Sequence, residues 1–153
     1  MTDAAGDAES AAKQRIATPI GFEDPNLEAA VRNAIGKQSG QLMDTDVMSV
    51  NYLDASNCNI SRLGGIEHLT GLTDLDLYNN RISDISPLAE LTSLEWLNLY
   101  CNQVSDIRPL TANPGLGQGC TISLDGNRLD LSPESDDMQT INTLMRRGAS
   151  VCY

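Results

Sequence analysis

The chain has 153 residues, with 21 acidic side chains against 10 basic ones and a net charge of −11. A nucleic-acid-binding domain needs Lys and Arg to replace the counterions around phosphates, so this composition argues against a nucleic-acid partner. No apolar run approaches the ~20 residues of a membrane-spanning helix, which argues against membrane insertion. The length suits one domain, and the acidic excess favours basic partners.

The first 21 residues are rich in Ala, Asp, Glu, Ser and Gly. They contain too few apolar side chains to offset the entropy of ordering, so we expect residues 1–21 to form a mobile tail. They also lack the apolar stretch of a secretory signal peptide. Two alternatives stay open here: a cytoplasmic protein, or an exported one whose signal was removed.

An N-terminal cap is expected over residues 22–49, with a helix over residues 25–36. Asp24 can cap this helix, Pro25 suits its first position, and Gly36 suits its end. The apolar stripe at helical spacing consists of Leu27, Ala30, Val31, Ala34 and Ile35.

An internal repeat of 22 residues follows. Residues 72–91 and residues 94–110 carry Leu, Asn, Ser-Asp, Ile and Pro-Leu in the same register, and residues 50–69 and 122–129 follow the same frame. Each copy matches L-x-x-L-x-L-x-x-N-x-[IL], a short strand followed by a turn. The strands stack in parallel, and their apolar side chains fill a continuous core that no single repeat could form. Residues 50–131 are therefore predicted as the repeats.

Asn80, Asn102 and Asn127 end successive strands of this pattern. A buried Asn amide at that place can satisfy backbone groups that have no partner in the sheet. Cys58 occupies the place in the first repeat, where a small side chain tolerates burial. The alternative, a reactive thiol at Cys58, would require exposure and a lowered pKa.

Residues 132–153 predict a C-terminal cap. A helix is expected over residues 132–147, with Ser132 or Ser135 as its N-cap, and the last residues return as a strand parallel to residues 121–125. The inner face of this helix is expected to carry Met138, Ile141, Leu144 and Met145.

Cys120 and Cys152 are expected in neighbouring strands. Cys120 shares the inward parity of Ile122, whereas Cys152 should point away from Val151 and Tyr153, which we expect in the core. The alternation therefore predicts no disulfide between the two cysteines.

The repeats, with N-x-I-S-D-I-S-P-L, resemble the 22-residue leucine-rich repeats of internalins and of many bacterial surface proteins. The stretch PNLEAAVRNAIGKQSGQL resembles the helical cap before such repeats, and the chain from Asn113 onward resembles the terminal cap of secreted or surface-anchored bacterial and archaeal members. The resemblance covers residues 22–153. It implies an α/β fold, namely a short right-handed solenoid of about four repeats with a helical N-terminal cap and a helix-strand C-terminal cap.

In strands of this kind, residues alternate between the core and the concave face of the sheet. Counting back from the Asn position gives three concave residues for each of four strands. These twelve are Tyr52, Asp54, Ser56, Asp74, Asp76, Tyr78, Trp96, Asn98, Tyr100, Thr121, Ser123 and Asp125. They include four of the five Trp and Tyr side chains in the chain, where chance would place fewer than one.

Tyr and Trp are typical binding anchors, because they offer a large contact area at a low entropic cost. We therefore predict that the concave face binds a partner. The candidate partner-binding residues are Tyr52, Asp54, Asp74, Asp76, Tyr78, Trp96, Asn98 and Tyr100. The alternative is structural, since cross-strand pairs such as Tyr78 with Tyr100 stabilise a sheet by themselves.

Asp54 and Asp76 occupy the same row on adjacent strands, with Asp74 nearby. Like charges placed opposite one another on a sheet are unfavourable, which favours a basic partner or a bound cation. The alternative is that solvent and salt screen these charges well enough. A bound Ca²⁺ is disfavoured, because it needs six to eight oxygen ligands and a flat sheet brings too few of them together.

Catalytic and metal-binding patterns are missing from the sequence. The chain has a single histidine, His68, no C-x-x-C pair among its four cysteines, and no converging nucleophile or acid-base pair. The sequence thus predicts a monomeric, non-catalytic module without a cofactor, secreted or on the cell surface, that binds a protein or peptide. Two alternatives stay open: an intracellular regulatory subunit like those of protein phosphatases, and a structural spacer within a larger surface protein.

Overall fold

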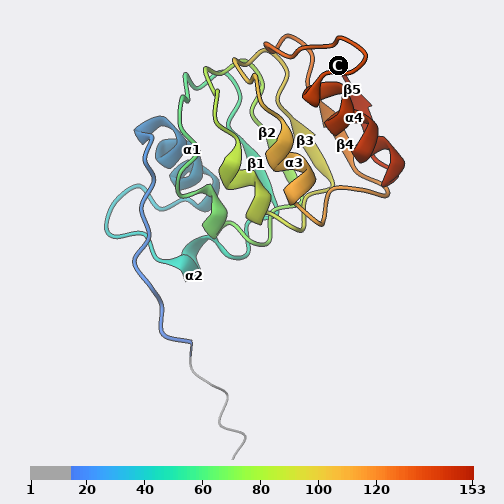
Figure 1. Cartoon of the computed structure of the whole chain (residues 1–153). Coiled ribbons are helices and arrows are strands. Elements are labelled where there is room, and N and C mark those ends of the chain that lie inside the picture. The colour runs from blue at the N-terminus through green and yellow to red at the C-terminus, as the bar shows by residue number, and fades with distance from the viewer. Residues whose placement is uncertain (1–14) are drawn as a thin grey trace, which may run out of the picture.

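The structure is a computed structural model that describes residues 15–153 (Figure 1). Most of the expected tail, residues 1–14, lies outside the described residues. Ile20 already belongs to the fold, because its N–H donates to Leu42 O at 2.9 Å and its side chain is buried in the core. The fold therefore begins slightly before the expected boundary, at the point where an apolar side chain can cover the end of the core.

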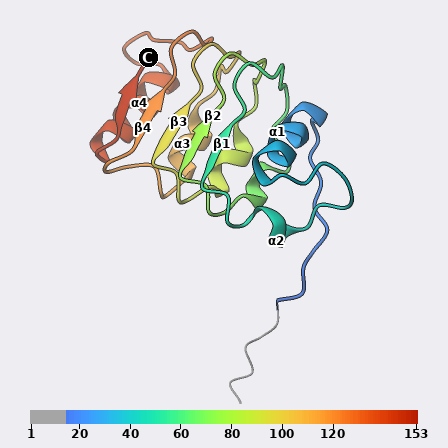
Figure 2. The ribbon, with the colours of Figure 1, turned by 180° about the vertical axis from the view of Figure 1, so that it is seen from behind.

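Five short parallel strands form one sheet in chain order, as Figure 2 shows from the strand side. They are β1 (Tyr52–Asp54), β2 (Asp74–Asp76), β3 (Trp96–Asn98), β4 (Thr121–Ser123) and β5 (Ser150–Cys152). Their register aligns Leu53, Leu75, Leu97 and Ile122 in one fully buried row. The predicted leucine-rich-repeat solenoid is confirmed.

Short helices lie in the segments that return from one strand to the next, on the opposite side of the core (Figure 1). They are η1 (Ile66–His68), η2 (Ser86–Glu90) and α3 (Arg108–Ala112). The side chains of Asp84 and Asp106 precede η2 and α3 and accept the backbone N–H groups of Ser86 and Arg108. The recurring Ser-Asp pairs of the sequence therefore shape these turns.

The expected asparagine ladder is present. The Asn102 Oδ1 accepts from the N–H of Ile82 at 3.1 Å, and its Nδ2 donates to the carbonyl oxygens of Leu77 at 2.8 Å and Leu99 at 3.1 Å. Asn80 and Asn127 make the same kinds of bond one repeat earlier and one later. Each amide thus joins two neighbouring repeats through backbone groups that the sheet leaves unpaired.

Cys58 holds the corresponding place in the first repeat and is half-buried. Its N–H donates to Asn80 Oδ1 at 3.1 Å, and its Sγ donates to Ser56 O at 3.1 Å. Burial, together with the nearby Asp54 carboxylate, raises the pKa of the thiol. A neutral, partly covered thiol is a poor nucleophile, which favours the structural interpretation of Cys58.

The N-terminal cap consists of α1 (Pro25–Ile35) and α2 (Asp44–Val47). Asp24 caps α1 by accepting the N–H of Asn26, and Gly36 ends the helix with a φ of 69°. One expectation for its apolar stripe was wrong: Ala34 is exposed. The helix covers the end of the core with a narrower face, and Ala34 lies instead over a cleft beside β1.

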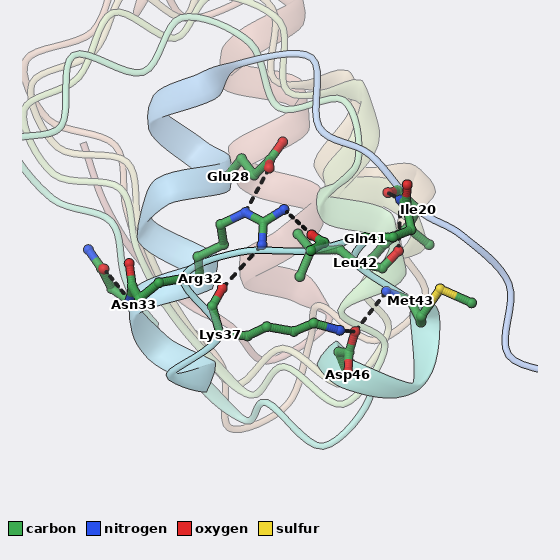
Figure 3. Close-up of polar contacts among 11 residues, drawn as sticks. Ile20, Glu28, Arg32, Asn33, Lys37, Gln41, Leu42, Met43 and Asp46 are labelled. Carbon is green, nitrogen blue, oxygen red and sulfur yellow. Dashed lines mark hydrogen bonds and ion pairs between the residues drawn. The ribbon is translucent and has the colours of Figure 1, made fainter.

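Arg32 holds the loop that follows α1 in place through hydrogen bonds to its backbone (Figure 3). Its guanidinium donates to Glu28 Oε1 at 2.8 Å and to the carbonyl oxygens of Lys37 at 3.1 Å and Gly40 at 3.0 Å. The Lys37 ammonium contacts the Asp46 carboxylate at 2.6 Å. These bonds tie the loop to both helices of the cap.

The C-terminal cap is the helix α4 (Asp136–Arg146) followed by β5. The helix begins about four residues later than the earliest predicted start, because Ser135 is its N-cap and accepts the N–H of Met138 at 3.1 Å. The alternative cap, Ser132, belongs instead to a turn in which it donates to the Asp130 carboxylate.

The inner face of α4 also differs in part from the expectation. Ile141 and Leu144 are buried as predicted, but Met145 is 49% exposed. Asp137 and Thr140 are buried instead, and Asp137 Oδ2 accepts the N–H of Asp130 at 2.9 Å. The inner face of α4 therefore includes a buried carboxylate, which holds the preceding turn through this hydrogen bond.

The four cysteines are free thiols. Cys120 is buried and its Sγ donates to Leu94 O at 3.2 Å, whereas Cys152 is exposed. The expected core position of Tyr153 was wrong, because its side chain is 43% exposed, and Val151 is only half-buried. Val151 lies in the last strand of the described sheet and Tyr153 directly follows that strand, and no further repeat packs beyond it within the described residues.

Candidate functional site on the concave face

The strand register arranges the concave residues in rows that run across the sheet. The first row holds Tyr52, Asp74, Trp96 and Thr121, and the second holds Asp54, Asp76, Asn98 and Ser123. A third row lies just past the strand ends and holds Ser56, Tyr78, Tyr100 and Asp125. The sheet therefore brings all eight candidate partner-binding residues to one face.

The aromatic side chains of this face differ in exposure. Tyr52 is 56% exposed and Tyr100 is 41% exposed, while Tyr78 and Trp96 are half-buried. The rings of Tyr78 and Tyr100 stack, with centroids 5.4 Å apart and planes 7° apart. Such a pair adds to the cohesion of the sheet, as the structural alternative predicts, but it also presents a flat apolar surface.

The second row carries a local motif that was not among the sequence-based predictions. Asp54, Asp76 and Asn98 each accept the backbone N–H of the residue two positions later, at 2.9 to 3.0 Å. An Asp or Asn at this place therefore has a structural reason, because it holds the turn that follows each strand. The recurrence of Asp or Asn four residues before the ladder position was the available signal.

The carboxylates of the concave face accept hydrogen bonds from uncharged backbone, hydroxyl and amide groups. Asp54 Oδ1 accepts from the Oγ of Ser56 at 2.7 Å and from its N–H at 3.0 Å, and these bonds hold the pKa of Asp54 below its ordinary value. Asp76 Oδ1 also accepts from Asn98 Nδ2 at 3.1 Å, and Asp74 Oδ2 accepts from the Thr73 hydroxyl at 2.6 Å.

Basic side chains pair elsewhere. Within residues 15–153, the ion pairs are Arg15–Asp44, Arg32–Glu28, Lys37–Asp46 and Arg108–Asp106. None of them includes a concave residue, so the four aspartates at positions 54, 74, 76 and 125 leave this face negatively charged. In the same part of the chain, no group of three or more His, Cys, Asp and Glu side chains could hold a metal ion.

A cleft lies at the end of the concave face, between α1 and β1, with a volume of about 430 Å³. Its lining consists of Asn26, Ala29, Ala30, Asn33, Ala34, Tyr52, Asp54 and Cys58. Two of the candidate partner-binding residues therefore also line a hollow. The sequence does not indicate this cleft, because the packing angle of α1 against the first strand leaves no periodic signal.

The repeat, the sheet and the ladder give this chain a leucine-rich-repeat fold that is similar to the fold of internalins. The family model described as "Leucine Rich repeats (2 copies)" matches residues 49–90. Among curated proteins, none matches the chain. No helix within the described residues is both long and apolar enough to cross a membrane.

Two solved structures from Listeria monocytogenes are similar to this chain. An internalin (inlF) shares 29% identity at a TM-score of 0.68, with 76% of this chain and 35% of that chain covered. The functional domain of InlJ, described as including a cysteine ladder, shares 28% identity at a TM-score of 0.63, with 72% of this chain and 24% of that chain covered. The chain thus spans about a third or less of the length of these relatives.

Proposed function

We propose that this chain is a non-catalytic interaction module that binds a protein or peptide through its concave face. The observation that carries the proposal is the exposure of Tyr52 and Tyr100, at 56% and 41%, beside carboxylates without a basic partner in the described chain. A sheet face that only contacts water gains nothing from exposed tyrosines or from carboxylates without a basic partner, whereas a binding interface uses both. Leucine-rich repeats present such a surface as a rigid platform.

The charge of the module favours a basic partner. The chain carries a net charge of −11, and four aspartates line the concave face. A negative patch steers a positive partner and raises the association rate, and salt screens that effect. We therefore propose a basic surface on the partner, bound by the module as a monomer, with association that slows as the ionic strength rises.

We also propose that the module acts outside the cell, either secreted or on the surface. The similarity to internalin structures and the 22-residue repeat support this placement. Fractionation of source cells with an antibody against the chain tests it. Detection in the medium or on intact cells is the expected result, and detection in the cytoplasm alone would favour an intracellular regulatory subunit instead.

A pair of matched tyrosine variants tests the binding face. Tyr100 is 41% exposed on the concave face, and Tyr153 is 43% exposed at the end of the last strand. Once a partner is captured from extracts of the surroundings of the source organism, Tyr100→Ala should weaken its binding by at least about tenfold, as loss of an interface anchor does. Tyr153→Ala should bind like the wild type.

Thermal unfolding of the same variants completes this test. The proposal expects both variants to unfold within a few degrees of the wild type, on the scale of 1 kcal/mol for a domain of this size. If Tyr100→Ala binds normally, or if it unfolds the chain, the concave tyrosines serve the sheet and the module is better described as a spacer.

A further inference from the structure

We propose that the cleft between α1 and β1 binds the side chain of an arginine that the partner presents at the edge of the concave face. This inference rests on the proposed function and adds the chemistry of one contact. The cleft adjoins the acidic second row, because Asp54 lines it and pairs in register with Asp76. A partner that lies across the concave face would therefore reach the cleft without leaving the acidic surface.

The α1 wall of the cleft suits the aliphatic part of an arginine. Ala29, Ala30 and Ala34 contribute methyl groups, and the volume of about 430 Å³ is ample for one long side chain. The Cys58 thiol also lines the cleft and is held neutral by its raised pKa. Long basic side chains bury their methylene stems on such surfaces and keep the charged end at a polar rim.

Tyr52 supplies a flat surface on the strand side of the cleft. Its side chain is 56% exposed, and it lies outside the stacked pair formed by Tyr78 and Tyr100. A guanidinium group is planar and stacks on an aromatic ring, gaining both dispersion and cation–π attraction. A compact, strongly hydrated ammonium group would use such a ring less well, which favours arginine over lysine.

Asp54 supplies the opposite charge. Its Oδ1 is fixed by two hydrogen bonds from Ser56, and no donor within residues 15–153 contacts its Oδ2. Asn26 also lines the cleft. Its Nδ2 donates to Asn59 O at 3.4 Å, and no donor within residues 15–153 contacts its Oδ1. A guanidinium with five N–H donors can satisfy acceptors that come from both the helix and the strand.

A titration followed by nuclear magnetic resonance tests this proposal without the partner. The probe is N-acetyl-arginine-N-methylamide added to the ¹⁵N-labelled chain, and the control probe is the citrulline analogue, which is similar in shape but uncharged. The arginine probe should shift amide signals of α1 and β1 saturably, with an affinity at least about tenfold higher than that of citrulline, as expected for a charge-assisted bond. Equal binding of the two probes would overturn the proposal, and so would shifts centred on β2 and β3.

A matched pair of aspartate variants sharpens this test. Asp130 binds the N–H and Oγ of Ser132 as Asp54 binds those of Ser56, but it lies outside the cleft. Asp54→Asn should weaken arginine binding by at least about tenfold, and Asp130→Asn should leave it unchanged. Asp54→Asn is expected to fold, because Asn98 makes the same turn on β3. Equal effects of the two substitutions would point to general charge attraction and overturn the proposal.

Filling the cleft gives a second test that leaves the charge intact. Ala34 is an exposed helix residue in the cleft lining, and Asn142 is an exposed residue of α4 far along the chain from it. Ala34→Leu should abolish the saturable shifts, whereas Asn142→Leu should not. If the arginine probe fails to bind the wild type, the cleft proposal falls. The proposed function would then still be tested separately, by measuring whether Tyr100→Ala weakens the binding of a captured partner.

Discussion

The amide of Asn102 is representative of the ladder residues, whose buried or half-buried side chains bind backbone groups of two repeats. It serves the N–H of Ile82 and the carbonyl oxygens of Leu77 and Leu99. Asn102→Ala would leave the N–H of Ile82 without a partner, and it would remove one of the two amide donors that each of the two carbonyl oxygens accepts. We therefore expect a loss of roughly 1 to 3 kcal/mol in the free energy of unfolding. Urea denaturation measures it, with Asn142→Ala, an exposed substitution on α4, as the control.

A loss below about 0.5 kcal/mol for Asn102→Ala, comparable to that of a surface substitution, would contradict the role given to the ladder.

The residues of the ladder and of the concave face could be predicted from the sequence, because both follow from a period of two within strands that recur every 22 residues. The turn role of Asp54, Asp76 and Asn98 was missed, although their recurrence was visible in the repeat. Their oxygens therefore serve the turns, and Asp54 also lines the cleft.

Among the elements, the link between α1 and the first repeat depends on Asp24. Its side chain is buried and accepts the N–H groups of Asn26, Ser61 and Arg62. Burial raises the pKa of Asp24, but the hydrogen bonds from Ser61, Asn26 and Arg62 outweigh it and hold the pKa below its ordinary value of 3.8. The carboxylate thus stabilises the fold above about pH 4, and this contribution is lost as the pH falls through the lowered pKa.

We expect Asp24→Ala to lose roughly 2 to 4 kcal/mol in the free energy of unfolding at pH 7, since a cap and two further backbone bonds disappear. The difference from the wild type should shrink as the pH falls below about 4, where protonation removes the same contribution from the wild type. Urea denaturation at a series of pH values measures both effects. A difference that does not change down to pH 2 would rule out the charged form as the cause.

At the same scale, element boundaries could be predicted only where local chemistry fixes them. The pattern Asp24-Pro25 located the start of α1, because cap and proline agree at one position. For α4 the sequence offered Ser132 and Ser135 as N-caps. Ser132 forms a turn with Asp130, and Ser135 caps the helix. Helical spacing alone placed Met145 on the inner face of α4, but its side chain is exposed. The burial of Asp137 depends on its hydrogen bond with the N–H of Asp130, a contact that apolar spacing does not indicate.

For the whole molecule, continuous packing predicts one cooperative unfolding transition. Each repeat packs only against its neighbours, and both ends of the buried row of leucines are covered by caps. Too few repeats are present for one half to retain a core of its own. The fluorescence of Trp96, in the middle of the sheet, and the far-ultraviolet circular dichroism of the whole chain should therefore change at the same urea concentration. Two separated transitions would show that the caps and repeats unfold independently.

The architecture of the whole molecule was also the most predictable part, because a repeat that cannot bury its own apolar face must stack on the next. The sequence could not indicate the cleft between α1 and β1, which arises from the packing of elements that do not repeat. Nor could it tell which of the concave side chains stay exposed: Tyr52 and Tyr100 do, whereas Trp96 is half-buried against its neighbours.

The most direct test of the concave face as a binding surface is site-specific photocrosslinking in extracts of the surroundings of the source organism. The photoreactive residue p-benzoylphenylalanine replaces Tyr100 on the concave face in one variant and Glu90, an exposed residue of η2 on the opposite side, in another. A product that forms from position 100 but not from position 90, and that excess unlabelled chain removes, is the predicted result. Crosslinking from position 90 alone, or from neither position, would contradict binding through the concave face.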